Sequence, residues 1–149
     1  MSIPDIEGAL ISKFDTLGYS TSVVAYPNGP SLDPAITTLN YSLTFLYADA
    51  VSAGLGIASA DRHHGLFQIT IRAPKVDASG NPAGTYTLMQ QVKAINTAFK
   101  KGTSMGYPVA SPTQYVRVTA PLTMNHFPKA EDGWYIIVLR IPFEADVLD

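Results

Sequence analysis

The stretch from Trp134 to Ala145 constrains the fold more than any other part of this sequence. Successive side chains of a β-strand point to opposite faces, so every second residue shares a face. One face of this stretch is apolar throughout, at Tyr135, Ile137, Leu139, Ile141 and Phe143. The other face begins apolar, at Trp134, Ile136 and Val138, and turns polar at Arg140 and Glu144. A strand that is apolar on both faces is normally central or covered on both sides. We therefore expect a central strand whose far end reaches solvent or a neighbour.

Four other segments have the composition of strands. Residues 39–48 and 66–73 alternate apolar and polar side chains, which predicts two half-buried strands. Residues 22–26 and 115–119 predict two shorter strands, and the first of these ends at the breaker cluster of residues 27–30. A connection that contains Pro121, Asn125, Pro128 and Gly133 joins the strand at 115–119 to the strand that begins at Trp134.

Two segments carry apolar residues at the three- and four-residue spacing of an amphipathic helix. The first covers residues 3–17, with Ser2 and Asp5 as a capping pair and Gly18 as its stop. The second covers residues 88–99, with Thr87 and Gln90 as a capping box at its start and Gly102 as its C-terminal cap.

These elements predict a single domain over residues 1–149 of the α+β class. We expect a mostly antiparallel sheet of four to five strands, with both helices packed on one face. Nine residues are expected to be buried between the helices and the sheet: Phe14, Phe67, Ile69, Leu88, Val92, Ile95, Phe99, Ile137 and Leu139.

Residues 49–65 lie between two predicted strands and are rich in Ala, Gly and Ser. A loop of this length without structure of its own is uncommon in a compact domain and is usually functional or disordered. Two interpretations remain open. The segment is a mobile loop that becomes ordered against neighbours, or it continues both strands into a protruding hairpin arm.

The charge content favours a protein with covered surfaces. Only 15% of the 149 residues are charged, against about 25% in an average soluble domain. Neutral surface on a small domain is often covered by partners, although Ser, Thr, Asn and Gly can also solvate it. The net charge of −2 and the absence of a long basic run disfavour a nucleic-acid-binding protein. A mildly acidic surface is nevertheless compatible with a channel through which DNA slides.

The expected compartment and the expected lack of a membrane span are based on features that the sequence does not contain. It contains no cysteine, which is compatible with assembly in a reducing cytoplasm. The first residues are acidic and do not resemble a signal peptide, and the longest apolar stretch, residues 134–139, is far below the roughly 20 residues that span a bilayer.

The sequence offers no clear catalytic or metal-binding motif. Asp61, Arg62, His63 and His64 form the densest titratable cluster, but adjacent residues of an extended chain point to opposite faces, so the two histidines could not easily share a metal. His126 completes a set of three histidines without supporting ligand spacing. The carboxylate pairs Glu131–Asp132 and Glu144–Asp146 fit solvated strand ends. We expect no enzyme activity, no cofactor and no metal.

Two segments resemble the phage tail terminator-like family, whose members cap the tail tube of long-tailed phages. Residues 61–69 (DRHHGLFQI) are similar to the opening of the family's central strand. Residues 133–146 (GWYIIVLRIPFEAD) are similar to its C-terminal strand. The order of helices and strands between and before these segments also matches. One departure is the connector of residues 27–34, which is longer than the family pattern predicts.

The resemblance implies a structural virion subunit rather than an enzyme. Such a subunit would form a hexameric ring, stop polymerisation of the major tail-tube protein and offer a surface to the head-completion protein. It would assemble in the host cytoplasm and reside in the virion tail, and DNA would pass through the ring without specific binding. Our expected subunit contact consists of neutral surface at Tyr47, Leu55 and Ile57, with Arg62 as a polar anchor.

Three other interpretations remain open. A neighbouring neck or tail-completion protein would show the same low charge. A small enzyme that depends on His63, His64 or His126 would need a concave pocket with converging polar groups. A free-standing monomer would show no change of mass with concentration.

Overall fold

The computed structural model describes residues 3–27, 29–33, 36–48, 51–52, 61–76, 79–82, 85–107, 114–125, 129–131 and 133–147. The elements follow in the order α1 (Ile3–Asp15), a 3-10 turn (Thr21–Val23), β1 (Val24–Ala25), β2 (Asn40–Tyr47), β3 (Val51–Ser52), β4 (Asp61–Pro74), α2 (Tyr86–Ala98), β5 (Ser104–Tyr107), β6 (Gln114–Val118), β7 (Thr123–Met124), β8 (Lys129–Glu131) and β9 (Trp134–Val147).

All of these strands belong to one sheet. Its main path runs β1-β2-β4-β9-β6-β5, and three short strands lie off this path, where β3 pairs with β4, and β7 and β8 pair with β9. β1 runs parallel to β2, while every other pairing is antiparallel. The predicted α+β class with two helices is confirmed. The predicted count of four to five strands was too low, because strands of two to four residues are too short to show an alternating pattern.

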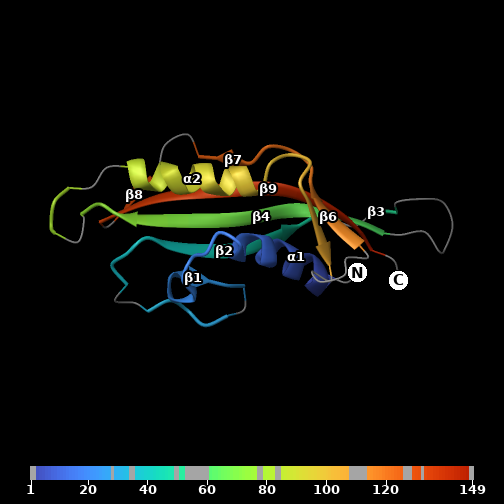
Figure 1. The fold of residues 1–149 in the computed structure, drawn as a ribbon, viewed down its shortest axis with the longest axis horizontal. Helices are drawn as coiled ribbons and strands as arrows, with labels where there is room; N and C mark the ends of the chain where they lie inside the picture. Colours follow the sequence, from blue (N-terminus) through green and yellow to red (C-terminus); the bar gives the residue numbers. More distant parts are fainter. Residues whose placement is uncertain are drawn as a thin grey trace.

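The long strands β4 and β9 lie next to each other at the centre of the sheet (Figure 1). They pair over 14 residues each, from Asp61 opposite Val147 to Pro74 opposite Trp134. β4 begins at Asp61 rather than at the predicted Leu66, and β3 pairs with its first two residues. The interpretation that the strands continue into the segment 49–65 is therefore correct for residues 51–52 and 61–65. Residues 49–50 and 53–60 lie outside the described part of the chain.

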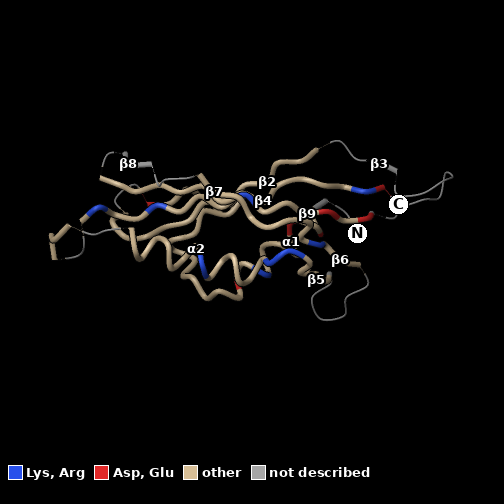
Figure 2. The backbone as a smooth tube through the Cα atoms, turned by 90° about the horizontal axis from the view of Figure 1, so that it is seen from above, with Lys and Arg blue, Asp and Glu red and all other residues tan. Residues whose placement is uncertain are grey.

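Both helices lie on the same side of the sheet, as predicted (Figure 2). The core fills the space between the two layers, and all nine residues expected to be buried are buried. From α1 the core receives Ile6, Ala9, Leu10 and Phe14, whose spacing places them on one stripe of the helix. From β9 it receives the odd-numbered residues between Ile137 and Ala145.

The ends of α2 differ from the prediction. The helix starts at Tyr86 with Thr85 as its N-cap, and Thr85 makes no side-chain capping bond. Thr87 is therefore the second residue of the helix, and the predicted capping box of Thr87 and Gln90 was wrong. The C-cap is Phe99, whose N–H donates to the Ile95 carbonyl. Gly102 lies beyond the cap with a φ of 88° and donates its N–H to Val118, so it turns the chain towards β5.

β9 is a central strand, as its two apolar faces predicted. β4 pairs with one of its edges, and β6, β7 and β8 share the other. Of the two arrangements expected for such a strand, the structure has the central position rather than cover on both faces. Among the described residues, both helices lie on the face of Ile137 and Leu139, whereas Trp134, Ile136 and Val138 on the other face are only half-buried. The sheet therefore leaves one face open.

Candidate assembly surface

The open face of the sheet consists of the even-numbered residues of β2, β4 and β9, together with Arg117 of β6, which lies opposite Glu144. The register sets them in rows across the three strands, such as Leu46–Leu66–Pro142 and Thr44–Gln68–Arg140. The rows carry apolar, neutral polar and charged side chains, and Leu46 remains 45% exposed. An antiparallel sheet commonly turns one polar face to water. This face is instead mixed, with half-buried apolar side chains at Leu66, Ile136 and Val138 among the polar ones.

All four arginines of the protein lie on this open face. Arg62 binds Asp146 through two hydrogen bonds of 2.8 and 3.3 Å, and Arg117 binds Glu144 at 2.8 Å. Arg140 donates to Gln68 at 3.3 Å, and the guanidinium of Arg72 lies 4.8 Å from the centre of the Trp134 ring. Each arginine is therefore held along the sheet by a neighbour on the same face.

The ion pair of Arg62 and Asp146 marks the end of the open face near the C-terminal end of β9. The hydrogen bond from Arg62 lowers the pKa of the Asp146 carboxyl, and the charge of the same guanidinium adds to this effect. Both side chains keep more than a third of their surface exposed, so water screens the attraction between them. The pair orders this end of the face more than it stabilises the fold.

A second surface lies where α1 meets the β1–β2 edge of the sheet. The Tyr47 hydroxyl donates to Glu7 at 2.8 Å, and the Tyr26 hydroxyl donates to Asp15 at 2.9 Å. Burial, and then the hydrogen bond to Glu7, raises the pKa of the Tyr47 hydroxyl. Glu7 and Asp15 are eight residues apart and thus lie on one side of α1. Two tyrosine–carboxylate pairs therefore border this edge.

Part of the same edge pairs with no described strand. Ala48 donates its N–H to the His64 carbonyl, so the backbone N–H and C=O groups of the even-numbered residues of β2 bond to β4. The backbone groups of the odd-numbered residues point to the other side of the strand, away from β4. β1 pairs only with Tyr41 and Ser42, and no described strand covers β2 from Leu43 to Tyr47. A groove of about 460 Å³ lies beside this stretch and is lined by Glu7, Ala25, Tyr26, Pro27, Ser42, Leu43, Thr44 and Phe45.

The residues expected to form the subunit contact fall on different surfaces. Tyr47 pairs with Gly65 on the helix-covered face and is 40% exposed at the β2 edge. Arg62 lies on the open face. Leu55 and Ile57 lie outside the described residues. Tyr47 and Arg62 therefore belong to two separate candidate surfaces rather than to one patch.

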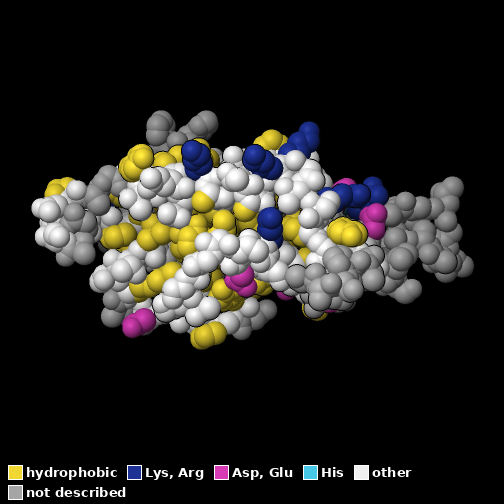
Figure 3. Space-filling model, viewed as in Figure 1, with side chains coloured by type: hydrophobic (Ala, Val, Ile, Leu, Met, Phe, Trp, Pro, Cys, Tyr) yellow, Lys and Arg dark blue, Asp and Glu magenta, His cyan; other side chains and the backbone are white. Residues whose placement is uncertain are grey.

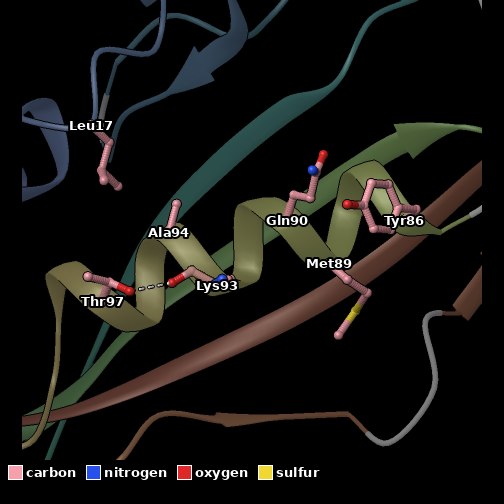
Figure 4. Close-up of a pocket in the computed structure, with 7 residues that line it drawn as sticks. All are labelled: Leu17, Tyr86, Met89, Gln90, Lys93, Ala94 and Thr97. Carbon is pink, nitrogen blue, oxygen red and sulfur yellow. Dashed lines mark hydrogen bonds between the residues drawn. The ribbon is translucent and has the colours of Figure 1, made fainter.

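The helix-covered side carries a wide groove along α2. Its volume is about 740 Å³, and it is lined by Leu17, Tyr86, Met89, Gln90, Lys93, Ala94 and Thr97. Leu17 faces α2 from the segment after α1, while Met89 points to the opposite side of the helix from Gln90 and Ala94 (Figure 4). Apolar side chains are visible along the same face of the molecule (Figure 3). The lining is mostly apolar, and its polar groups do not converge on one point.

The histidines do not come together in the described part of the chain. His63 is paired with Ala145 on the helix-covered face, whereas His64 is paired with Glu144 on the open face, as the alternation of a strand predicts. His126 and Asp132 lie outside the described residues. Among the residues that the structure describes, no group of three His, Asp or Glu side chains could hold a metal ion. No described helix is both long and apolar enough to cross a bilayer.

Arg72, Glu7 and Asp15 were not singled out in the sequence, and Arg140 was noted only as the residue where the second face of the last strand turns polar. The two arginines occupy polar positions of alternating strands, and this pattern alone places each of them opposite the core. That both lie on one continuous face depends on the pairing of β4 with β9. Glu7 and Asp15 are recognisable as part of a surface only from their hydrogen bonds to Tyr47 and Tyr26, which come from other parts of the chain.

Comparison with known proteins identifies the fold alone. No protein-family model matches the chain, and no curated protein matches it. A solved structure that carries only a serial number as its name has the same fold, with a TM-score of 0.72 and 18% sequence identity. The match covers 100% of this chain and 99% of that one. The α+β domain described above is therefore a fold that occurs in at least one solved protein over its entire length.

Proposed function

We propose that this protein is a structural virion subunit that caps the tail tube of a long-tailed phage as a homo-hexameric ring. It ends polymerisation of the major tail-tube protein and provides the surface to which the head-completion protein binds. The ring assembles in the host cytoplasm and remains in the virion tail. DNA passes through it without specific binding, and the subunit performs no catalysis and needs no cofactor.

The open face of the sheet is the observation that carries this proposal. β4 and β9 are 14 residues long, so this face extends over about 45 Å, and β2 adds a third strand over eight of these residues. With strands about 4.8 Å apart, the resulting area is about 570 Å², compared with the roughly 800 Å² that each partner contributes to a specific protein interface. The face combines arginine, tryptophan and aliphatic side chains, which is the composition of such interfaces.

A ring subunit needs two different surfaces that meet head to tail. The open face and the β1–β2 edge provide two such surfaces on one chain. The α2 groove leaves a third, apolar surface for the tube or the neck. The resemblance of residues 61–69 and 133–146 to tail terminators favours this assembly over that of other structural proteins of similar size.

A phage that lacks this protein provides the test. Such a phage is expected to make tails of uncontrolled length that do not join heads, as seen by electron microscopy of lysates. Complementation with the wild-type chain restores fixed tails and infectious particles. Tails of normal length joined to heads without the protein would exclude the proposed function. Tails of fixed length that fail only to join heads would identify a neck or tail-completion protein instead.

A further inference from the structure

Among the side chains that the structure describes, arginine and lysine lie on different sides of the molecule. All four arginines lie on the open face of the sheet, together with the carboxylates Glu144 and Asp146. The described lysine side chains lie elsewhere, on or beside the helices or, for Lys75, over the ring of Tyr135 on the helix-covered face. Protein interfaces are enriched in arginine and aromatic residues and depleted in lysine. This segregation therefore favours a protein partner for the open face over a phosphate backbone.

Two arginines of this face have no carboxylate partner among the described side chains. Arg62 and Arg117 form ion pairs, whereas Arg72 stacks on Trp134 and Arg140 binds the neutral Gln68. The described face thus carries four arginines against two carboxylates, a formal charge of +2, while the chain as a whole carries −2. Arg140 is opposite Gln68, four residues from Arg72 along β4, so the two positions are about 13 Å apart.

The β1–β2 edge carries a matching pair of negative charges. Glu7 and Asp15 are held in place by the hydroxyls of Tyr47 and Tyr26. They are eight residues apart on α1, which corresponds to about 12 Å along the helix axis. The backbone positions of the two carboxylates are thus offset by about 12 Å along α1, and those of the two arginines by about 13 Å along the strands.

We infer that the Arg72–Arg140 face of one subunit binds the Glu7–Asp15 edge of a second copy of this chain. The inference rests on the proposed ring and specifies its subunit contact. Each copy uses its open face for one neighbour and its β1–β2 edge for the other, so the contact is head to tail and can close into a ring. Tyr26 and Tyr47 contribute aromatic area beside the carboxylates, and the aliphatic rows of the open face pack against them.

Reversal of the charges tests the contact. One variant carries R72E and R140E, and a second carries E7K and D15K, so each retains one native surface. Sedimentation velocity at low salt, over concentrations up to about 1 mM, measures the mass of each protein alone and mixed. Each variant alone is expected to associate at least about tenfold more weakly than the wild type. Because the substituted surfaces are complementary to one another, an equimolar mixture and a single chain with all four substitutions should regain association.

The control variant is K93E, which makes the same kind of charge change on the exposed surface of α2, outside both surfaces. It should associate as the wild type does. Thermal unfolding of every variant confirms that it is folded. R72E removes the stacking on Trp134 and can therefore weaken the fold. In that case the test is repeated with two single variants at exposed positions, R140E on the open face and D15K on the β1–β2 edge, measured alone and mixed.

Three results would overturn the inference. Wild-type association in both double variants would place the contact elsewhere on the chain. A wild-type chain that stays monomeric at about 1 mM would show that these surfaces do not bind one another. Retention of the chain on duplex DNA that is lost in the arginine variant, without any change of mass, would identify nucleic acid as the occupant of the open face. The proposed function is tested separately, by the length of the tails in a phage that lacks the protein. That result does not depend on which surfaces of the subunit form the contact.

Discussion

Replacement of Gly65 by alanine should destabilise the protein, although alanine is the better residue in a regular strand. Gly65 lies in β4 opposite Tyr47 of β2. A Cβ atom at this position would overlap the carbonyl oxygen of Leu46 and lie 3.2 Å from the Leu46 carbonyl carbon and the Tyr47 Cα atom. All three atoms belong to the backbone, so no side chain can rotate away to make room. β2 or β4 must shift instead.

Two effects of opposite sign set the magnitude. Loss of the conformational freedom of glycine stabilises the folded chain by about 0.5–1 kcal/mol. Insertion of a methyl group into closely packed surroundings costs about 1–3 kcal/mol. We therefore expect G65A to lower the free energy of unfolding by about 0.5–2 kcal/mol. The exposed residue Thr44, on the adjacent strand β2, provides the control, because T44A should change stability by less than about 0.5 kcal/mol.

Denaturant unfolding followed by fluorescence of Trp134 measures both variants. A lower midpoint with an unchanged slope reports a change in stability rather than in the compactness of either state. A G65A protein as stable as the wild type, or more stable, would refute the reasoning. It would mean that the two strands are not held as closely at this point as the register of β2 and β4 requires.

Three further predictions concern the core, the ion pair and the β2 edge. L139A should cost about 2–5 kcal/mol in the free energy of unfolding, because Leu139 is fully buried, and a loss below about 0.5 kcal/mol would place it outside the core. D146N should cost less than about 1 kcal/mol at neutral pH. Since Arg62 lowers the folded-state pKa of Asp146, this difference should vanish as the pH falls below the ordinary carboxyl value of 3.8, and a difference that persists in acid would contradict the assignment. Y47F removes the hydrogen bond to Glu7 and should cost about 0.5–1.5 kcal/mol, with no effect if that bond is absent in solution.

The elements recovered from the sequence are those with enough residues to show a period. α1, α2, β2, β4 and β9 are 8–14 residues long, and each lies where its apolar pattern predicted, within a few residues at the ends. β3, β5, β7 and β8 have two to four residues and show no readable alternation. Their strand conformation is selected by backbone hydrogen bonds to a neighbouring strand rather than by their own side chains.

The candidate surfaces were predicted less well, for a related reason. The low charge content indicated neutral surface that partners cover, but it did not indicate where the charges lie, and the open sheet face carries all four arginines. It proposed Tyr47 and Arg62 as parts of one contact, but the pairing of Tyr47 with Gly65 and of Arg62 with Asp146 places them on opposite faces. Spacing along one strand determines which residues share a face of that strand. Which strands share a sheet is determined by long-range pairing.

The sequence by itself determined the class of the fold, the two helical stripes, the central position of β9 and the nine core residues, because each depends on the local periodicity of apolar side chains. The sequence also indicated that both helices cover one face, but only the tertiary structure showed that no described helix covers the other face (Figure 2). It also gathered the four arginines from β4, β6 and β9 on that open face and set Glu7 beside Tyr47. These juxtapositions join residues far apart in the chain, and the pairing of strands and the packing of layers that create them leave no periodic mark on the sequence.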